Sequence, residues 1–299
     1  MKQRVVEFIF RLVLLLRSHN FLKHRVKKQN FDKKSLFFKL IGIRLNCFMN
    51  DTQMKKRTHI YEERTYRQRV TAKDLTSFNV TVKETDLWVS SERNLEKETR
   101  DLVFGYRYHI ETYIGSHPEF AATLSPYPDD PYAPSIIKEM ISVAKRLGIG
   151  PMASVAGAIA QYVAFGLMKL TDQVIVENGG DVFMKLNRPA TVSVFAGDSP
   201  LSEKFGIRIP KEKMPISVCS SSRTVGHSLS FGVTDAACLV SNSALFADAA
   251  ATALGNRVKG KNDMQEAAVW ASELEGIIGG IIIVGDKMAT WGEIELVNL

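Results

Sequence analysis

The strongest constraint on the fold is a series of short strand patterns between residues 173 and 240, with an alanine-rich segment on each side. Each pattern is apolar, and turn-forming residues such as Gly, Pro, Asn, Asp and Ser follow it. The flanking segments carry few charges and many small residues, which predicts closely packed helices. Strands in series between helices favour an α+β protein. We expect strands at residues 173–176, 191–195, 207–209, 216–218 and 237–240, and helices at 152–170 and 244–254.

Further elements are predicted outside this series. Apolar residues recur at helical spacing from Leu95 to Tyr113, and Ser135 is placed to cap a helix that ends near Gly148. Residues 125–134 contain four prolines and are expected to form an exposed loop. The other expected elements are an antiparallel strand pair at 61–70 and 75–89, a helix at 264–274, and a C-terminal hairpin of 280–284 with 291–297.

The basic charge of the chain is confined to its first part. The net charge is +7, but residues 1–50 hold 12 Lys and Arg against two acidic residues, a net of +10. The remaining residues therefore carry a net of −3. A mildly acidic body gives no support for nucleic-acid binding.

The first fifty residues fit neither a membrane span nor a secretory signal. The apolar run at 5–16 is short and contains Glu7 and Arg11, and basic residues follow it. Two interpretations remain: a basic segment on an anionic membrane surface, or a stretch that precedes the true start at Met49 or Met54. The abrupt change of composition favours the second. We therefore expect a basic extension at 1–53 and one domain at 54–299, with membrane contact only if the extension is part of the natural protein.

Cysteine usage argues against disulfides and zinc sites. Cys47, Cys219 and Cys238 lie far apart and form no CxxC pair. This usage fits a reducing, cytoplasmic compartment.

A glycine pair follows the first strand of the series. Gly179, Gly180 and Asp181 form a segment whose backbone can approach a phosphate or a flat ring. The same residues are equally suited to a hairpin turn. Upstream, the start of the small-residue helix near Gly150 is a candidate anion site, and the helix itself is suited either to close packing or to a cofactor wall.

A second polar segment follows the strand at 216–218. It holds the hydroxyls of Ser220, Ser221, Ser222 and Thr224, together with Cys219, Arg223 and His227. His227 could donate to a phosphate or act as a general acid or base. Cys219 is a candidate nucleophile or sulfur carrier, or else a half-buried packing residue. A serine-rich turn with a locally bonded histidine is the simpler alternative.

The alanine-rich helix at 244–254 holds a candidate metal site. Asp248 and Thr252 are four residues apart and so lie on one helix face. Mg²⁺ uses such a small set of protein oxygens and completes its shell with water and phosphate oxygens. The alternative is that Asp248 only interacts with a helix dipole.

Together these segments resemble the ApbE-like superfamily. GPMASVAGAIA, VIVENGGDVF, VCSSSRTVGHSLSFG and ALFADAAATALGN carry the resemblance, which extends from about Tyr61 to the C-terminus. It implies a T-fold-like α+β architecture, antiparallel sheets with helices packed on them. The superfamily's better-known members are FAD:protein FMN transferases, which use Mg²⁺.

Site roles follow from the resemblance. Asp248 and Thr252 match the metal helix, and Gly179, Gly180 and Asp181 match the flavin loop. The serine-rich loop and its histidine match Ser220, Ser221, Ser222, Thr224 and His227. Two parts of the transferase pattern differ: His-Ser-Leu-Ser-Phe replaces H-x-x-D-P, and the N-terminal half lacks the acidic FAD-binding helix.

Three functions are therefore expected as alternatives. The first is Mg²⁺-dependent binding of FAD, FMN or a related nucleotide, with FMN transfer to a protein acceptor or cleavage of FAD as its reaction. The second is sulfur transfer or an accessory role in anaerobic sulfur metabolism, with Cys219 as the carrier. The third is a non-catalytic interaction module, because a fold does not determine a function.

Overall fold

The computed structural model describes residues 74–223 and 231–299. These residues belong to the unit Glu63–Leu299. The expected division between residues 53 and 54, the expected strand at 61–70 and Cys47 lie outside the described residues and stay predictions.

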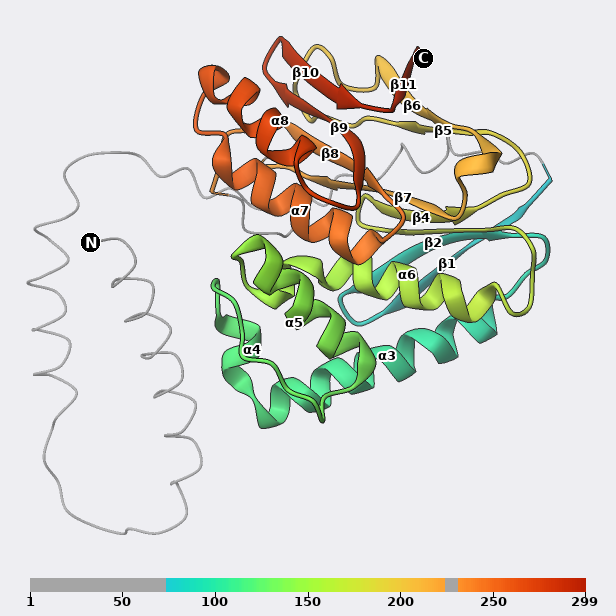
Figure 1. The fold of residues 1–299 in the computed structure, drawn as a ribbon. Coiled ribbons are helices and arrows are strands. Elements are labelled where there is room, and N and C mark those ends of the chain that lie inside the picture. Colours follow the sequence, from blue (N-terminus) through green and yellow to red (C-terminus); the bar gives the residue numbers. More distant parts are fainter. Residues whose placement is uncertain (1–73, 224–230) are drawn as a thin grey trace, which may run out of the picture. The chain divides into compact units, whose positions relative to one another are not determined.

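Two antiparallel sheets form the framework (Figure 1). In the larger sheet the eight strands follow the order β1-β2-β3-β4-β7-β8-β9-β10, and in the smaller the order is β11-β6-β5. Every neighbouring pair is antiparallel. The strands are β1 (Thr76–Val82), β2 (Thr85–Ser91), β3 (Val174–Asn178), β4 (Asp181–Lys185), β5 (Ala190–Ser193), β6 (Phe205–Ile209), β7 (Ile216–Ser221), β8 (Ala236–Ser241), β9 (Ile277–Val284), β10 (Lys287–Gly292) and β11 (Glu295–Asn298).

Helices cover one face of the larger sheet and the smaller sheet covers the other (Figure 1). The longer helices are α3 (Glu96–Ser116), α5 (Ser135–Leu147), α6 (Val155–Leu167), α7 (Ala244–Arg257) and α8 (Met264–Ser272). The shorter ones are α4 (Pro118–Ala122), η3 (Pro151–Ser154), η4 (Lys211–Lys213) and η5 (Lys261–Asp263). This arrangement confirms the expected α+β class with antiparallel sheets and packed helices.

Alternation along the strands divides the core into two parts. On β7, Cys219 packs among the helices, whereas Ile216 and Val218 pack toward the smaller sheet. Successive side chains of a strand point to opposite faces, so a central strand that is buried on both faces reads as a continuous apolar run. This explains the apolar run Val174–Val176 in β3, whose residues are all buried.

Several expected boundaries were wrong. Residues 75–89, expected as one strand, form most of the β1–β2 hairpin, because Lys83 takes a positive φ of 53° and turns the chain. Ser135 does not cap α5: the cap position is Pro134, and Gly148 ends the helix with a φ of 70°, as expected. The C-terminal hairpin around Gly285 is confirmed as β9–β10, but residues 295–298 leave it and pair with β6 in the smaller sheet.

The described helices give no candidate membrane span by themselves. Only α5 joined to the stretch Pro151–Leu167, a pair bent by 107°, reaches the required length and composition.

Helices α6 and α7 cap each other. Asp248 of α7 accepts a hydrogen bond from the backbone N–H of Gly157, in the first turn of α6, at 2.8 Å. In return, Gln161 of α6 accepts from the backbone N–H of Ala244 at 2.8 Å and from the hydroxyl of Ser243 at 3.1 Å. Each helix thus satisfies amide groups that its partner leaves without an intrahelical acceptor.

Gly157 allows this close approach. A Cβ at this position would lie 2.3 Å from the carbonyl oxygen of Ala244 and 2.8 Å from Cβ of Asp248. The sequence left open whether the small residues of α6 serve packing or a cofactor. At Gly157 they serve helix packing.

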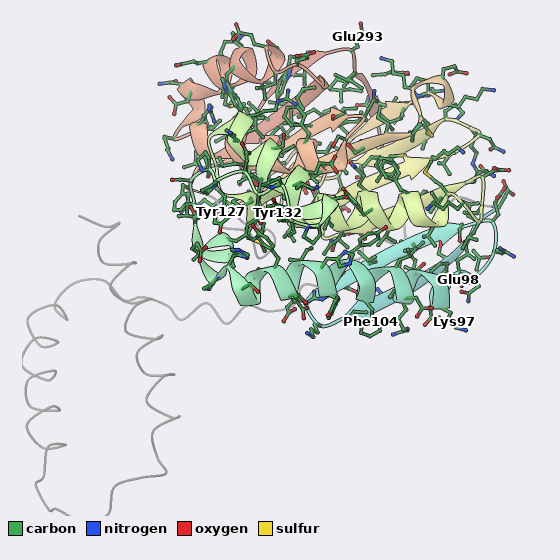
Figure 2. All side chains as sticks on the ribbon, turned by 60° about the horizontal axis from the view of Figure 1, so that its bottom comes forward. Lys97, Glu98, Phe104, Tyr127, Tyr132 and Glu293 are labelled. Carbon is green, nitrogen blue, oxygen red and sulfur yellow. The ribbon has the colours of Figure 1, made fainter. Side chains whose placement is uncertain are left out.

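Gly157→Ala is expected to lower the free energy of unfolding by about 1–3 kcal/mol, because backbone atoms would have to move. The matched control is Gly105→Ala on the outer face of α3, beside the exposed Phe104 (Figure 2). A Cβ at Gly105 meets nothing within 4 Å, so this change should stabilise the protein by about 0.5–1 kcal/mol. Urea unfolding measures both variants, and equal effects would contradict the packing argument.

Candidate functional site

A buried acidic cluster lies between the larger sheet and α7. Asp181 begins β4, Cys219 lies on β7, and Asp248 and Thr252 lie one turn apart on α7. Their exposed fractions are 5% for Asp181, 0% for Cys219, 7% for Asp248 and 8% for Thr252. The structure thus brings together residues that three separate sequence segments contribute.

Asp248 is both a helix cap and a buried charge. The N–H groups of Gly157 and Ala156 bond to its carboxylate, which favours the ionised form. Burial acts more strongly and raises the pKa of Asp248 to about 7. Because these two backbone N–H groups already bond to Asp248, they cannot bind a phosphate. The expectation of an anion site at the start of α6 is therefore wrong for the N–H groups of Ala156 and Gly157.

Asp181 faces Asp248 and is held by the neighbouring strand. Its Oδ1 accepts from the backbone N–H of Ser220 at 3.2 Å. Burial raises the pKa of Asp181 well above its ordinary value, and repulsion from the Asp248 carboxylate raises it further. Each of these buried carboxylates therefore disfavours ionisation of the other unless a cation compensates their charge.

The oxygen donors of this cluster fit a small hard cation. Asp181, Asp248 and Thr252 supply only oxygen, the donor that Mg²⁺ prefers, and the charge of a cation would relieve the repulsion between the two carboxylates. Within residues 74–223 and 231–299, no group of three or more His, Cys, Asp and Glu is placed to hold a metal by itself. A cation here would therefore complete its coordination shell with water or ligand oxygens.

The glycine pair forms the turn of the β3–β4 hairpin. Gly179 and Gly180 have φ values of 67° and 105°, which residues with a side chain rarely adopt. The N–H of Gly180 donates to Oε1 of Glu177 at 3.0 Å, and the hydroxyl of Ser220 donates to the carbonyl oxygen of Gly180 at 3.2 Å. The hairpin alternative is confirmed. A Cβ at Gly179 would meet nothing within 4 Å, so the backbone there is open to a ligand.

The serine-rich segment is divided between strand and loop. Ser220 and Ser221 lie in β7, not in a loop as expected, because β7 continues to pair with β8 through Ser221 and Ala237. Ser220 and Ser222 line the cavity described below, whereas the buried hydroxyl of Ser221 has no hydrogen-bond partner among the described residues. Thr224 and His227 lie outside the described residues, and their roles stay predictions.

Cys219 lies in a setting that suits an inert thiol. Its Sγ donates to the carbonyl oxygen of Ala244 at 3.3 Å. Burial, followed by the nearby carboxylates of Asp181 and Asp248, raises the pKa of the thiol well above its ordinary value. A thiol that stays protonated is a poor nucleophile. The nucleophilic role of Cys219 stays an untested prediction, and these contacts favour the packing alternative.

A cavity of about 110 Å³ lies on the opposite face of the same strands. Gly179, Gly180, Ser220 and Ser222, four of the expected cofactor residues, line it. Its other walls come from β2, from apolar side chains of β3, β4, β7 and β8, from Glu177 of β3, and from β5 with the residues that follow it. The cavity and the acidic cluster therefore occupy opposite faces of one sheet, beside the glycine turn.

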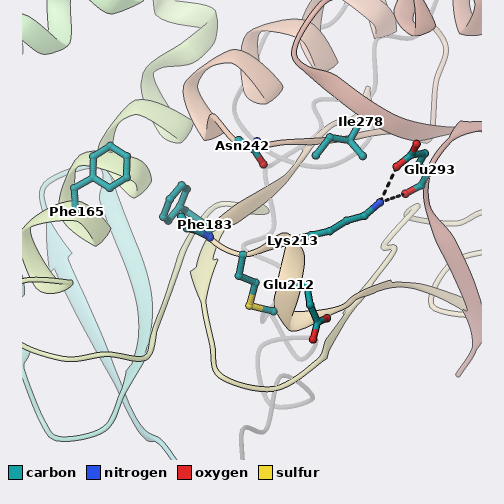
Figure 3. Close-up of a pocket in the computed structure, with 9 residues that line it drawn as sticks. Phe165, Phe183, Glu212, Lys213, Asn242, Ile278 and Glu293 are labelled. Atoms are coloured by element: carbon teal, nitrogen blue, oxygen red, sulfur yellow. Dashed lines mark hydrogen bonds and ion pairs between the residues drawn. The ribbon is translucent and has the colours of Figure 1, made fainter.

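A larger cavity of about 500 Å³ lies elsewhere (Figure 3). Phe165 and Phe183 form one side and the ion pair of Lys213 with Glu293 forms the other (Figure 3). Pro215, just before β7 begins at Ile216, lines this larger cavity. Ser220 and Ser221, near the acidic cluster, lie at the opposite end of β7. None of the expected site residues that the structure describes lines this cavity.

Gln161 and Trp88 were missed by the sequence reasoning. Gln161 is the residue through which α6 holds the start of α7, and Trp88 lines the smaller cavity. The signal for Gln161 was available, since it is a polar residue within the apolar segment VAGAIAQYVAFGL. No local signal marks Trp88, because its role depends on pairing between distant strands.

Asp181→Asn is expected to stabilise the metal-free protein at pH 8 by about 1–2 kcal/mol, and to have little effect near pH 4. Folding raises the pKa values of both carboxyl groups, so the folded state retains a proton that the unfolded chain releases above about pH 4. The stability of the wild-type protein should therefore fall as the pH rises from about 4 through about 7.

Urea unfolding in EDTA at several pH values measures this effect. The control is Asp286→Asn, because Asp286 is an exposed group paired with Lys261. Its pKa is lowered, chiefly by that pairing, so this change should give no gain at pH 8. A loss of stability at pH 8 in Asp181→Asn would contradict the assignment of a repulsive carboxyl pair.

The chain is similar in sequence to proteins of the UPF0280 group. It is 36% identical over 214 residues to a UPF0280 protein of Methanocella arvoryzae, covering 71% of this chain and 87% of the relative. It is 35% identical over 226 residues to a UPF0280 protein of Methanocaldococcus jannaschii, covering 73% of this chain and 92% of the relative.

Two solved structures are more distant matches. A mutant form of the flavin transferase ApbE from Vibrio cholerae matches with a TM-score of 0.47 and 13% identity over 73% of this chain and 96% of that chain. The apo form of the flavinyl transferase ApbE of Pseudomonas stutzeri gives a TM-score of 0.44 and 13% identity, over 73% and 94% of the two chains. A family model described as AbpE bacteria matches residues 67–276, most of the chain. The chain therefore belongs to the AbpE bacteria family.

Proposed function

We propose that this protein binds a flavin nucleotide, FAD or FMN, together with Mg²⁺ at the acidic cluster between the larger sheet and α7, with Asp181, Asp248 and Thr252 as its oxygen donors. The observation that carries the proposal is the buried pair of carboxyl groups, whose mutual repulsion a cation would relieve. The identity of the ligand comes from the resemblance of residues 179–181 and 247–252 to the flavin loop and the metal helix of the ApbE-like superfamily.

Each residue has a distinct part in binding. Asp248 and Thr252 would hold the cation from one face of α7, and Asp181 would add negative charge from the sheet. Ser220 holds Asp181 through its backbone N–H, and the reciprocal caps of α6 and α7 hold Asp248. Bound Mg²⁺ would neutralise charge on the phosphate oxygens and so favour attack at phosphorus.

The reaction that fits this arrangement is displacement at the FMN phosphorus of FAD. The oxygen of water or of a protein hydroxyl forms the new P–O bond, the pyrophosphate P–O bond breaks, and AMP leaves. With water the product is FMN, and with a hydroxyl it is an FMN-modified protein acceptor. A base must take the proton of the attacking group. His227 stays the predicted candidate for that role, as the protein acceptor and the cytoplasmic location also stay predictions.

Neither alternative function gains support from the structure. Sulfur transfer would need an accessible thiolate, but Cys219 is fully buried and its thiol pKa is raised. A non-catalytic module would have no need of two buried carboxyl groups that destabilise the fold when both are ionised.

Calorimetric titration of the full chain with FAD, FMN and ADP, with and without Mg²⁺, tests the proposal. We expect Mg²⁺-dependent binding that weakens at least tenfold in Asp248→Asn. Asparagine retains an oxygen acceptor for the N–H of Gly157 and removes only the charge, so the α6 cap is preserved. Asp286→Asn serves as the control, because Asp286 is exposed and pairs with Lys261.

Chromatography of AMP and FMN released from FAD measures the reaction in the same samples. Mg²⁺-independent binding, or equal affinity in Asp248→Asn, would exclude this metal site. The absence of binding by all three nucleotides would overturn the proposed function.

A further inference from the structure

The side chain of Asn178 joins the glycine turn to the start of α6. Its Nδ2 donates to the carbonyl oxygen of Ala156 at 3.0 Å. Asn178 is the last residue of β3, and its exposed fraction is 8%, so the bond forms in a setting that is largely closed to water. Water competes weakly for such a bond, and the bond therefore holds the end of the β3–β4 hairpin against the helix.

Both residues in this bond lie next to the acidic cluster. Asn178 is directly opposite Asp181 in the β3–β4 register, and the side chains of directly opposite residues share one face of a sheet. The N–H of Ala156 bonds to the carboxylate of Asp248, beside the bond from Gly157. Asn178 thus adjoins the carboxyl group on the sheet, and Ala156 adjoins the carboxyl group on α7.

The two halves of the cluster are otherwise held from different sides. Asp181 accepts from the backbone N–H of Ser220 on β7, and the hydroxyl of Ser220 donates to the carbonyl oxygen of Gly180. Asp248 is held by the reciprocal caps of α6 and α7. Neither of these two sets of bonds connects the hairpin to α6. The bond between Asn178 and Ala156 makes that connection, and so it bears on the separation of the two carboxyl groups.

An amide suits this position better than an acid would. Asn178 adds no charge to a cluster that already holds two carboxyl groups. An ionised aspartate of the same shape would lack the N–H donor that bonds to Ala156, and it would add a third negative charge. The part of Asn178 is therefore to position the carboxyl groups, not to react.

The separation of two carboxylates affects which cation they hold well. Mg²⁺ requires near-ideal octahedral geometry with oxygen ligands at about 2.0–2.1 Å, whereas Ca²⁺ accepts about 2.3–2.6 Å and irregular shells. Donors that are fixed in place can therefore favour Mg²⁺. Loosening the same donors penalises Mg²⁺ more than Ca²⁺.

We propose that Asn178 is a positioning residue that gives the acidic cluster a preference for Mg²⁺ over Ca²⁺, because it fixes the end of the β3–β4 hairpin to the start of α6. Asn178 acts through Asp181 and Asp248 and does not itself bind the cation. The inference rests on the proposed function, in which these carboxylates and Thr252 hold a cation.

Competition with Mn²⁺ measures this preference in the full chain. Bound Mn²⁺ loses the sharp electron paramagnetic resonance signal of the free ion, and Mg²⁺ or Ca²⁺ is added until the signal returns. In Asn178→Ala we expect Mg²⁺ affinity to fall about tenfold and Ca²⁺ affinity about twofold, so that the ratio of the two affinities falls about fivefold. A residue with a merely structural role would lower both affinities equally or leave both unchanged.

Ser217→Ala is the matched control. Ser217 is fully buried, and its hydroxyl donates to the carbonyl oxygen of Ser241 at 2.7 Å, so this change removes a bond of the same kind. Ser217 lies near the start of β7, whereas Ser220 lies near its end. This control should leave the ratio of affinities unchanged. Asn178→Ser has a shorter donor and should also lower the ratio, which keeps the test decisive if the alanine variant does not fold.

The inference is overturned if the wild-type protein binds Mn²⁺ but the Asn178 variants keep the wild-type ratio, or if Ser217→Ala lowers the ratio as much as they do. The proposed cation site would stand in both cases. Failure of the wild-type protein to bind Mn²⁺, with and without FAD, would instead overturn the proposed function and this inference with it.

Discussion

The mutual capping of α6 and α7 is the interaction on which the candidate site depends. Asp248 accepts from the first turn of α6, and Gln161 accepts from the N–H of Ala244 at the start of α7, so each helix bonds amide groups of its partner. The two helices can meet this closely only because Gly157 has no side chain. The contact sets the position of Asp248, and with it the face of α7 that also carries Thr252.

The Asp248 carboxylate therefore has two opposite effects on the stability of the fold. As a cap, Asp248 is stabilised by backbone N–H groups, but as a buried charge beside Asp181 it destabilises the fold whenever both groups are ionised. A protein that required only the cap could use an asparagine or a serine there. The presence of the second carboxyl group, held by the N–H of Ser220, is best explained by a ligand that carries positive charge.

Local patterns predicted those parts of the site that depend on spacing alone. Asp248 and Thr252 were placed on one face because they are four residues apart, and a hairpin turn at Gly179 and Gly180 was one of two predicted alternatives because glycine permits a positive φ. Long-range pairing decided what local patterns could not. Ser220 belongs to a strand because β8 continues beside it, and residues 295–298 join the smaller sheet because β6 offers them a free edge. The roles of Gln161 and Trp88 also depend on partners far away in the sequence.

The central claim is that Asp181 and the Asp248–Thr252 face of α7 form one cation site. The most direct test is a crystal structure of the full chain soaked with Mn²⁺, with anomalous scattering to locate the ion. The account predicts a peak about 2.0–2.3 Å from a carboxylate oxygen of Asp248 and from the hydroxyl of Thr252, with other ligands from water. An empty cluster in crystals that bind Mn²⁺ elsewhere would contradict it.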